Sequence, residues 1–394
     1  MRDAEFPADP YPGAWPGHSY VHDAGVGHRL HPDSGRFAGW RVDDRDLDDW
    51  LAERGATPLV DRLPLLVYGS NRCPSKITWL RRRLGLTGPV VVLAARTENV
   101  AAVWASGLRK RDGQRPAVLA AAPGVTERHA LWLATPDQVE VLDVCEGRGR
   151  RYRLVRLGPG NPIRTEDGAL VERPWCYLGL GAIRRPLLVA DPGGPRSPGG
   201  LADPGDLAHP RGLAHPRDLA HPRDLAHPDG LAHPDGLAGP AGPGGRPVRC
   251  AELAQAEAAA LVGVAATDDG LAATDVTGGP APEQWPDALF GYGLLQPGRS
   301  GWPLVEPHAA GPSRPATAAG AVYDTGLGWP AMLLEPGQRT PGTVTPLRTP
   351  AELIPTLDRY EGPDYRRVRV TLTDGTVAWA YIWIGDRSGL RPLP

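Results

Sequence analysis

The sequence predicts an α+β protein of two small mixed β-barrels with flanking helices, joined by a low-complexity linker rich in Pro, Gly and His. One observation is an internal repeat: residues 142–147 (Leu-Asp-Val-Cys-Glu-Gly) and 357–362 (Leu-Asp-Arg-Tyr-Glu-Gly) each precede a Tyr-Arg pair and alternating aliphatic and Arg residues. Another is an aliphatic run that ends in Tyr-Gly ahead of each copy, 78 residues before the Glu in the first half and 69 in the second. Two signals in the same order at similar spacing indicate two homologous domains.

Length and charge limit the classes of function. A chain of 394 residues is long enough for two or three domains, each with its own core. Its 43 basic and 45 acidic residues give a net charge of −2, which shows no bias toward nucleic acid or an anionic membrane surface. We therefore expect a small or neutral partner, with no nucleic acid and no membrane.

The cysteines argue against a metal site. Cys73, Cys145, Cys176 and Cys250 lie far apart and form no Cys-x-x-Cys pair, so neither a zinc site nor a disulfide framework is expected. We expect reduced thiols, no metal and no other cofactor. The N-terminus lacks the apolar core of a signal peptide, and no stretch is long enough to cross a bilayer. These features favour a soluble, cytoplasmic protein.

Shifts in composition divide the chain into five parts. We expect a poorly ordered lead-in, a first domain, a disordered hexapeptide-repeat linker, a helix with a connector, and a second domain, at 1–43, 44–190, 191–249, 250–284 and 285–390 respectively. Within the first domain, residues 44–53 place Leu47, Trp50 and Leu51 at helical spacing, which predicts a short amphipathic helix.

The rest of the first domain combines short strands with two helices. Strands are expected at 63–67, 90–95, 117–122, 129–134, 151–157 and 173–178, and helices at 76–84 and 136–144. The second helix begins at Thr135-Pro136-Asp137, a capping signature. This pattern favours a small mixed or antiparallel barrel.

Between the domains, residues 201–242 hold seven six-residue units such as Leu-Ala-His-Pro-Arg-Asp. Proline at every sixth position forbids a helix and a central strand. The repeated histidines suggest metal binding, but in polyproline II successive ones would lie about 18 Å apart, too far to share an ion. A flexible linker is the favoured interpretation. The stretch 250–263 after it predicts a helix that stops at Gly263.

The second domain has the clearer pattern. Strands are expected at 289–292, 318–323, 342–347, 366–373 and 377–384, with a helix that opens at Thr349-Pro350. The last two strands are joined by Asp374-Gly375, a strong hairpin turn signal.

Glu146 and Glu361 are the candidate catalytic residues. Each stands where a helix meets a strand, just before a Gly that allows a tight turn, so it is placed to project into a barrel mouth. Burial there would raise the pKa of the carboxyl and suit it to proton transfer near neutral pH. A solvated Glu-Gly turn is the alternative, and the duplication of the motif favours function.

The Tyr-Gly turns are the candidate binding elements. In Tyr68-Gly69-Ser70-Asn71, backbone N–H groups, the Ser hydroxyl and the Asn amide can face an anion. The alternative is an ordinary strand-to-loop turn, where these residue types are common. Tyr152 and Tyr365 follow the two Glu by six and four residues, and either bind a ligand through their hydroxyls or pack in the barrel.

The combination of Tyr-Gly-Ser-Asn, Leu-Asp-x-x-Glu-Gly and Tyr-Arg-x-Val resembles the γ-glutamylcyclotransferase superfamily. The second half, with Gly-Ala-Val-Tyr-Asp at 320–324 and Trp-Pro-Ala at 329–331, resembles its AIG2-like branch. The resemblance spans roughly 63–180 and 287–386, and so implies a tandem of two such domains.

The resemblance implies a pocket between the Tyr-Gly loop and the Glu in each domain. It assigns binding of the glutamyl moiety to Tyr68, Gly69, Ser70 and Asn71 in the first domain, and to Tyr292, Gly293 and Leu294 in the second. Glu146 and Glu361 would be the general acids and bases. Leu294 departs from the Ser or Thr that is usual in the family, so we expect the second site, rather than the first, to be altered or inactive.

The resemblance implies a metal-independent reaction on a small-molecule γ-glutamyl substrate. The α-amine of the substrate attacks its own γ-carbonyl, which gives 5-oxoproline and a free amine. Correct orientation supplies up to about 7–11 kcal/mol to such an intramolecular step. A non-catalytic protein that binds a small ligand or a partner with the same barrels is the alternative, and a structural tandem with vestigial pockets is a third possibility.

Overall fold

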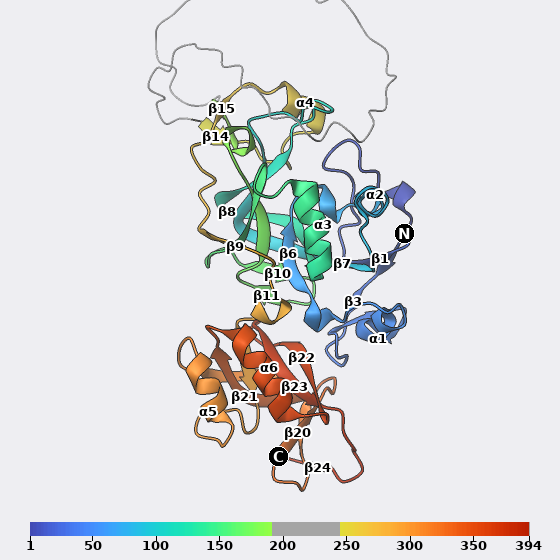
Figure 1. Ribbon diagram of the computed structural model, residues 1–394, viewed down its shortest axis with the longest axis vertical. Coiled ribbons are helices and arrows are strands. Elements are labelled where there is room, and N and C mark those ends of the chain that lie inside the picture. The colour runs from blue at the N-terminus through green and yellow to red at the C-terminus, as the bar shows by residue number, and fades with distance from the viewer. Residues whose placement is uncertain (191–244, 394) are drawn as a thin grey trace, which may run out of the picture. The chain divides into compact units, whose positions relative to one another are not determined.

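The computed structural model describes residues 1–190 and 245–393 (Figure 1). Residues 1–189 and the chain from Pro247 onward form one unit, in which we distinguish a first lobe (1–189 and 247–287) and a second lobe (288–393). The predicted hexapeptide-repeat linker lies outside the described residues except at 245–249. Within the described chain, no helix is long and apolar enough to span a membrane.

In the part of the first lobe that the structure describes, one sheet of ten strands runs β11-β10-β7-β8-β6-β12-β9-β16, with β1 paired to β7 and β2 paired to β1. Its strands are β1 (Tyr20–Asp23), β2 (Val26–Arg29), β6 (Leu63–Val67), β7 (Val90–Trp104), β8 (Ala117–Ala134), β9 (Tyr152–Leu157), β10 (Ile163–Thr165), β11 (Leu170–Val171), β12 (Trp175–Gly179) and β16 (Ala273–Asp275). The central strand β6 is buried along its whole length, which explains its continuous Leu-Pro-Leu-Leu-Val run.

The sheet of the second lobe has the order β18-β21-β17-β23-β22. Its strands are β17 (Ala288–Gly291), β18 (Arg314–Ala319), β21 (Arg339–Pro346), β22 (Tyr365–Thr371) and β23 (Val377–Trp383). The hairpin expected at Asp374-Gly375 is present, and Gly375 has a φ of 91°, which favours glycine. The strand expected at 318–323 is instead divided between β18 and β19 at Gly320, whose φ is 136°.

Smaller elements complete the two lobes. The short strands are β3 (His31–Pro32), β4 (Trp40–Val42), β5 (Arg45–Asp46), β13 (Leu187–Ala190), β14 (Gly245–Pro247), β15 (Val264–Ala265), β19 (Ala321–Asp324), β20 (Pro330–Leu333) and β24 (Arg391–Pro392). The helices are α1 (Leu47–Ala52), α2 (Pro74–Leu84), α3 (Pro136–Glu146), α4 (Gln255–Ala260), α5 (Trp302–Val305) and α6 (Pro350–Glu361). Helix α4 is shorter than the helix expected at 250–263.

The two sheets share an arrangement. The first-lobe path β7-β8-β6-β12-β9 corresponds to β18-β21-β17-β23-β22, and in each path only the third and fourth strands are parallel. The closed barrels expected from the sequence are not found in the described residues. In the second lobe, the edge strands approach each other at a single backbone hydrogen bond, from Thr373 N to Thr317 O (3.0 Å). Pro315 in β18 has no N–H to extend this contact.

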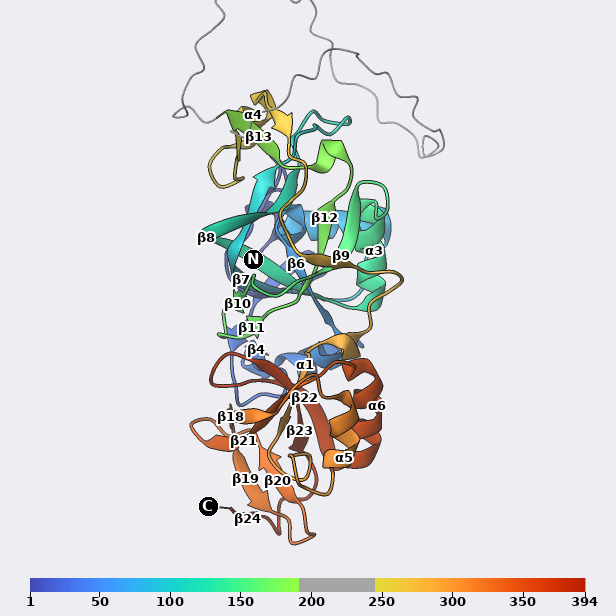
Figure 2. The same cartoon turned by 90° about the vertical axis from the view of Figure 1, so that its left-hand side faces the viewer.

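Each lobe places a helix that ends in Glu-Gly against its sheet. Helix α3 begins with a capping box between Thr135 and Gln138, whereas α6 begins with Pro350 at its first position. The apolar face of α6, formed by Leu353, Ile354 and Leu357, packs on Trp379 of β23. Figure 2 shows α5 and α6 together on one face of the second-lobe sheet.

The first 43 residues, expected to be poorly ordered, are part of the first lobe. Tyr20 and Val21 are fully buried in β1, which pairs with β7. The hydroxyl of Ser75 in α2 donates to the carbonyls of Asp3 and Phe6 (2.7 and 2.6 Å). The expectation is wrong because the apolar pattern of β1 lasts only two residues, while its pairing partner lies about 70 positions further along the chain.

Arginines of β22 connect the second lobe to the first. The Arg366 guanidinium donates to the Asp48 carboxylate (2.9 Å). Arg369 donates to the carbonyls of Leu59 and Val60 (3.0 and 2.6 Å), and its guanidinium lies over the Trp285 ring at 4.5 Å. By strand alternation, Arg369 lies on the face of β22 opposite to Val368 and Val370, which pack in the lobe core, whereas Arg366 lies on the valine face near the end of the strand.

Candidate active site

Three side chains fix the end of helix α6 to the second-lobe sheet. The hydroxyl of Tyr292 donates to the carbonyl of Tyr381 in β23 (2.7 Å). The hydroxyl of Tyr381 in turn donates to the carboxylate of Asp358 in α6 (2.8 Å). Glu361 follows Asp358 by three residues and ends the helix, and Gly362 turns the chain away with a φ of 71°. The position of Glu361 is thus set by the sheet through this chain of hydrogen bonds.

The first lobe repeats the same connections. Tyr68 donates to the carbonyl of Tyr177 in β12 (2.5 Å), and the hydroxyl of Tyr177 donates to Asp143 in α3 (2.6 Å). Glu146 again follows the Asp by three residues and ends the helix, and Gly147 has a φ of 65°. In the Leu-Asp-x-x-Glu-Gly motif, the Asp therefore fixes the helix to the sheet, and the Glu three residues later ends the helix.

A cavity of about 260 Å³ lies at Glu361. It is lined by Phe290, Gly291, Tyr292, Gly293, Leu294, Leu295, Trp329, Pro330, Tyr360, Glu361, Asp364, Tyr365 and Tyr381. All five residues predicted for the second site, namely Tyr292, Gly293, Leu294, Glu361 and Tyr365, are among them. The structure thus brings together residues that lie up to 73 positions apart in the sequence.

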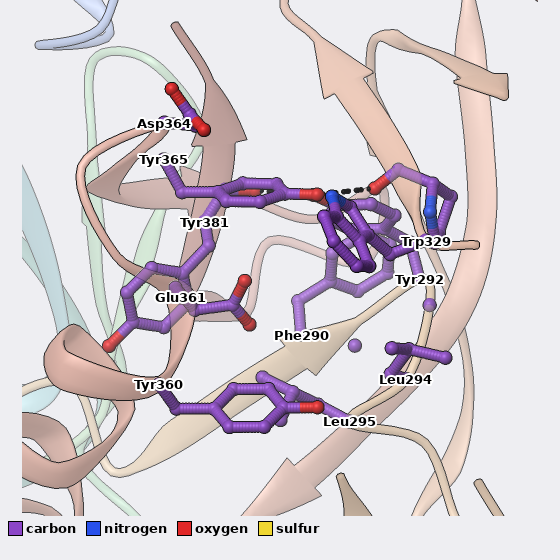
Figure 3. Close-up of a pocket in the computed structure, with 13 residues that line it drawn as sticks. Phe290, Tyr292, Leu294, Leu295, Trp329, Tyr360, Glu361, Asp364, Tyr365 and Tyr381 are labelled. Carbon is purple, nitrogen blue, oxygen red and sulfur yellow. Dashed lines mark hydrogen bonds between the residues drawn. The ribbon is translucent and has the colours of Figure 1, made fainter. Parts of the chain in front are cut away.

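The Glu361 carboxylate points into this cavity, near the rings of Tyr360 and Tyr381 (Figure 3). Burial raises its pKa from 4.5 to about 7. Among the described residues, no side chain or backbone group donates a hydrogen bond to it. The lining holds a second carboxylate, Asp364, and no Lys or Arg. Glu361 is therefore suited to take up and release a proton near neutral pH.

The turn after β17 lines the same cavity and contains two backbone N–H groups without a hydrogen-bond acceptor in the described chain. Within the described chain, the N–H groups of Gly293 and Leu294 donate to no protein acceptor. A side chain at Gly293 would collide with Pro330, since an added Cβ would lie 2.6 Å from the Pro330 ring. The close approach of Pro330 therefore requires glycine here and leaves the backbone as the surface of the cavity.

Tyr365 packs in the second lobe and also lines the cavity. Its ring lines the cavity and packs edge-on against Trp383, with ring centroids 5.1 Å apart. Its hydroxyl donates to the carbonyl of Pro330 (2.8 Å; Figure 3). In the first lobe, Tyr152 is 7% exposed and donates to the carbonyl of Ala117 (3.3 Å). Both tyrosines are held by backbone carbonyls.

Glu146 has a different environment. The Asn71 amide donates to its carboxylate (2.7 Å). Burial raises the pKa of Glu146, and the hydrogen bond from Asn71, followed by the charge of Lys76, opposes this rise. The hydroxyl of Ser70 makes no hydrogen bond in the described chain. The structure thus brings Asn71 to Glu146, as the resemblance implies, but gives Ser70 no protein partner.

Counting from the Tyr-Gly pair, Leu295 stands in the second lobe where Asn71 stands in the first. Leu295 lines the cavity and is 7% exposed. Because leucine cannot donate a hydrogen bond, Glu361 lacks the stabilisation that Asn71 gives to the charged form of Glu146. Burial at a position where Leu295 offers no donor therefore leaves the pKa of Glu361 raised.

Sequence reasoning missed eight lining residues of the second site: Phe290, Gly291, Leu295, Trp329, Pro330, Tyr360, Asp364 and Tyr381. The available signal was local for five of them, since each of these five lies within two residues of a predicted site residue. Trp329, Pro330 and Tyr381 lie elsewhere in the sequence and required knowledge of the fold. Tyr11 in the first lobe was also missed: its hydroxyl accepts a hydrogen bond from Ala117 N (3.1 Å).

Comparison with known proteins bears on the second lobe. Residues 289–393 match a family model described as "Gamma-glutamyl cyclotransferase, AIG2-like". None of the curated proteins matches the chain. Among solved structures, the crystal structure of an uncharacterized protein from Homo sapiens is similar at 16% identity, over 31% of this chain and 68% of that one, with a TM-score of 0.25. The family match alone thus indicates a γ-glutamyl cyclotransferase, AIG2-like domain in the second lobe, at residues 289–393.

Substitution of Leu295 by Asn tests the origin of the Glu361 pKa. An amide at this position should donate to the carboxylate and lower its pKa from about 7 toward the ordinary range. Titration of the Glu361 carboxyl by ¹³C NMR measures the shift. Leu294→Asn is the matched control, because the residue at its place in the first lobe makes no contact with the Glu. An unchanged pKa in Leu295→Asn would contradict this explanation.

Substitution of Tyr381 by Phe tests the connection between α6 and the sheet. Loss of the hydrogen bond to Asp358 should lower the free energy of unfolding by about 1.5–3 kcal/mol, as for a bond to a charged group. Urea unfolding measures the change. In the control Tyr323→Phe, the hydroxyl lost is one that donates to Glu335 on the surface of the lobe, and little change is expected there. Equal effects of the two substitutions would be evidence against this role of Tyr381.

Proposed function

We propose that the second lobe is a γ-glutamyl cyclotransferase-type enzyme that converts a γ-glutamyl amide into 5-oxoproline and a free amine. The observation that carries the proposal is the Glu361 carboxylate, buried in a cavity with a pKa of about 7 beside free backbone N–H groups. The family match of residues 289–393 supports it. The chemistry requires one group that accepts and returns a proton, and Glu361 is such a group.

In the proposed mechanism, the substrate supplies its own nucleophile. Glu361 takes a proton from the α-ammonium, and the α-nitrogen attacks the γ-carbonyl carbon. The N–H groups of Gly293 and Leu294 stabilise the negative charge that develops on the carbonyl oxygen. The bond from the γ-carbon to the amine nitrogen then breaks as Glu361 gives that proton to the leaving amine. The regenerated carboxylate takes the second proton from the ring nitrogen, which becomes the lactam N–H of 5-oxoproline, and passes it to the free amine or to solvent. No covalent enzyme intermediate forms.

On the same grounds, we propose that turnover takes place at the second site. This differs from the expectation, drawn from Leu294, that the second site is altered or inactive. An oxyanion can be held by backbone N–H groups, so the loss of a hydroxyl at Leu294 does not remove the donors that the mechanism uses. The Leu-Leu pair instead keeps the carboxyl free of donors, which favours a pKa near neutrality. Glu146, already bonded to Asn71, is less suited to exchange protons.

We assign the two lobes to one domain type present twice. Three features support this: the common strand order and directions, the Tyr–Tyr–Asp connections, and a Glu-Gly pair at the end of α3 and α6. In this proposal, the site residues of the first lobe are Glu146, Tyr68, Gly69, Ser70, Asn71 and Tyr152. The family match covers the second lobe.

A non-catalytic ligand-binding role is the second candidate. It is favoured by the cavity lining, in which Leu294 and Leu295 add apolar surface and no basic side chain faces an anionic substrate. In that case, binding of a γ-glutamyl amide would be retained in Glu361→Gln, and no 5-oxoproline would form in the wild type.

Activity measurements on Glu361→Gln test the proposal. Removal of the proton acceptor should lower kcat/KM for 5-oxoproline release by about 100-fold or more. Glu146→Gln is the matched control, because it makes the same change at the corresponding position of the first lobe, and it should retain activity. The assay needs a panel of γ-glutamyl amines, glutathione included. Loss of activity in Glu146→Gln alone would assign turnover to the first lobe instead.

The pH dependence follows from the raised pKa of Glu361. The carboxylate is the form that accepts a proton, and it predominates above about pH 7. We expect kcat/KM to be constant above that pH and to fall about tenfold per pH unit below it. Leu295→Asn should move this acid limb to lower pH. A profile that is flat from pH 5 to 8 would show that the carboxylate of Glu361 does not limit the reaction.

A further inference from the structure

The Tyr-Gly turn of the first lobe has a neighbour that the second lobe lacks. The Tyr11 hydroxyl lies directly over Gly69, since a Cβ added at Gly69 would be 2.8 Å from it. The same hydroxyl accepts a hydrogen bond from Ala117 N (3.1 Å), while Tyr152 donates to Ala117 O (3.3 Å). Tyr11 therefore fills the space between the Tyr-Gly turn and Tyr152, two elements of the predicted first site.

The Tyr11 hydroxyl lies close enough to Tyr152 and Glu146 for both to affect its pKa. Burial raises the pKa of Tyr11, and the hydroxyl of Tyr152 and the carboxylate of Glu146 contribute to the increase. The aromatic ring is held on two further sides. The Arg109 guanidinium lies over it at 4.7 Å, and the Trp104 ring is tilted against it at 6.5 Å. The ring thus has a shaped pocket of its own.

The backbone around Tyr11 is bound on both sides. Its N–H donates to the Gln114 side chain (3.3 Å), and its carbonyl accepts from the Gln255 side chain (3.3 Å). The Gln114 amide also donates to Asp9 (2.7 Å). These glutamines belong to parts of the chain 103 and 244 residues away, so the first lobe recognises main-chain groups of this segment as a peptide-binding site does.

In the second lobe, the equivalent space over Gly293 faces the ring of Pro330 and the cavity. Side chains of that lobe, and no N-terminal segment, line the space in front of Glu361. The two lobes thus share a framework and differ in what occupies it.

We infer that the first lobe is a peptide-binding site for an Asp-Pro-Tyr-Pro segment, filled in cis by residues 9–12, with the Tyr11 hydroxyl over Gly69 of the Tyr-Gly turn, where the second lobe has the ring of Pro330 over Gly293. Tyr11 denies small molecules access to Glu146, and the first lobe binds its own N-terminal segment in place of a small molecule. The statement that the second lobe takes a small-molecule substrate rests on the proposed function. The statement that residues 9–12 fill the site of the first lobe does not.

Hydrogen exchange in the full-length protein tests the inference without any measurement of turnover. In the wild type, amides at 5–17 and at 66–72 should exchange slowly. Tyr11→Ala should speed exchange at both segments at least tenfold and leave residues 288–295 unchanged. Trp15→Ala is the control, because Trp15 belongs to the same segment but its ring stacks with Arg72 and Arg128. It should leave exchange at 66–70 unchanged, and residue 72 is left out of this comparison because Arg72 contacts Trp15.

Addition of a synthetic peptide provides the second arm. A peptide with the sequence of residues 5–17 should restore slow exchange at 66–72 in Tyr11→Ala, and the same peptide with Ala in place of Tyr should not. Tyr11→Phe, which keeps the ring and removes the hydroxyl, serves if Tyr11→Ala does not fold, and should show a smaller increase in exchange. Unchanged exchange at 66–72 in these variants, or no effect of the peptide, would overturn the inference.

Discussion

The hydrogen bond from Tyr381 to Asp358 is the contact on which the second site depends. It joins the central parallel strand pair to the last turn of α6, and a parallel bond from Tyr177 to Asp143 does the same in the first lobe. A carboxylate that ends a helix is otherwise free to move with the fraying last turn. The Tyr–Asp bond holds that turn against the sheet, so Glu361 and Glu146 are presented at fixed positions beside the Tyr-Gly turn. Both lobes use it, which makes it a property of the domain rather than of one reaction.

On this common framework, small differences in sequence separate the lobes. Asn71 gives Glu146 a hydrogen-bond donor, whereas Leu295 gives Glu361 none. Burial without a donor raises the pKa of a carboxyl, while a donor to the charged form lowers it. The first lobe additionally receives Tyr11 over Gly69. One lobe thus has a carboxyl with a raised pKa and no donor, and the other has a carboxyl bonded to Asn71 and a Tyr-Gly turn covered by Tyr11.

The sequence allowed the main features of the site to be predicted because they are local and repeated. Glu361 with Gly362 and the Asp374-Gly375 hairpin follow from short motifs whose geometry is set by glycine. Features that arise from pairing of distant segments were not accessible. Tyr20 and Val21 were assigned to a disordered lead-in because nothing nearby indicates that they pair with β7. Closed barrels were expected from the number of short strands, but closure depends on edge contacts such as the one limited by Pro315. The expectation that the second site is altered or inactive rested on Leu294 alone, because the position of Leu295 relative to Glu361 depends on the fold.

In the proposed arrangement, the site of the second lobe is open to a small molecule and the related site of the first lobe is not. Isothermal titration calorimetry of the full-length protein with 5-oxoproline, combined with NMR chemical-shift mapping of backbone amides, tests this most directly. We expect one molecule bound per chain, with shifts at Gly293 and Leu294 and none at Gly69. Two molecules per chain, or shifts at Gly69 alone, would contradict the account.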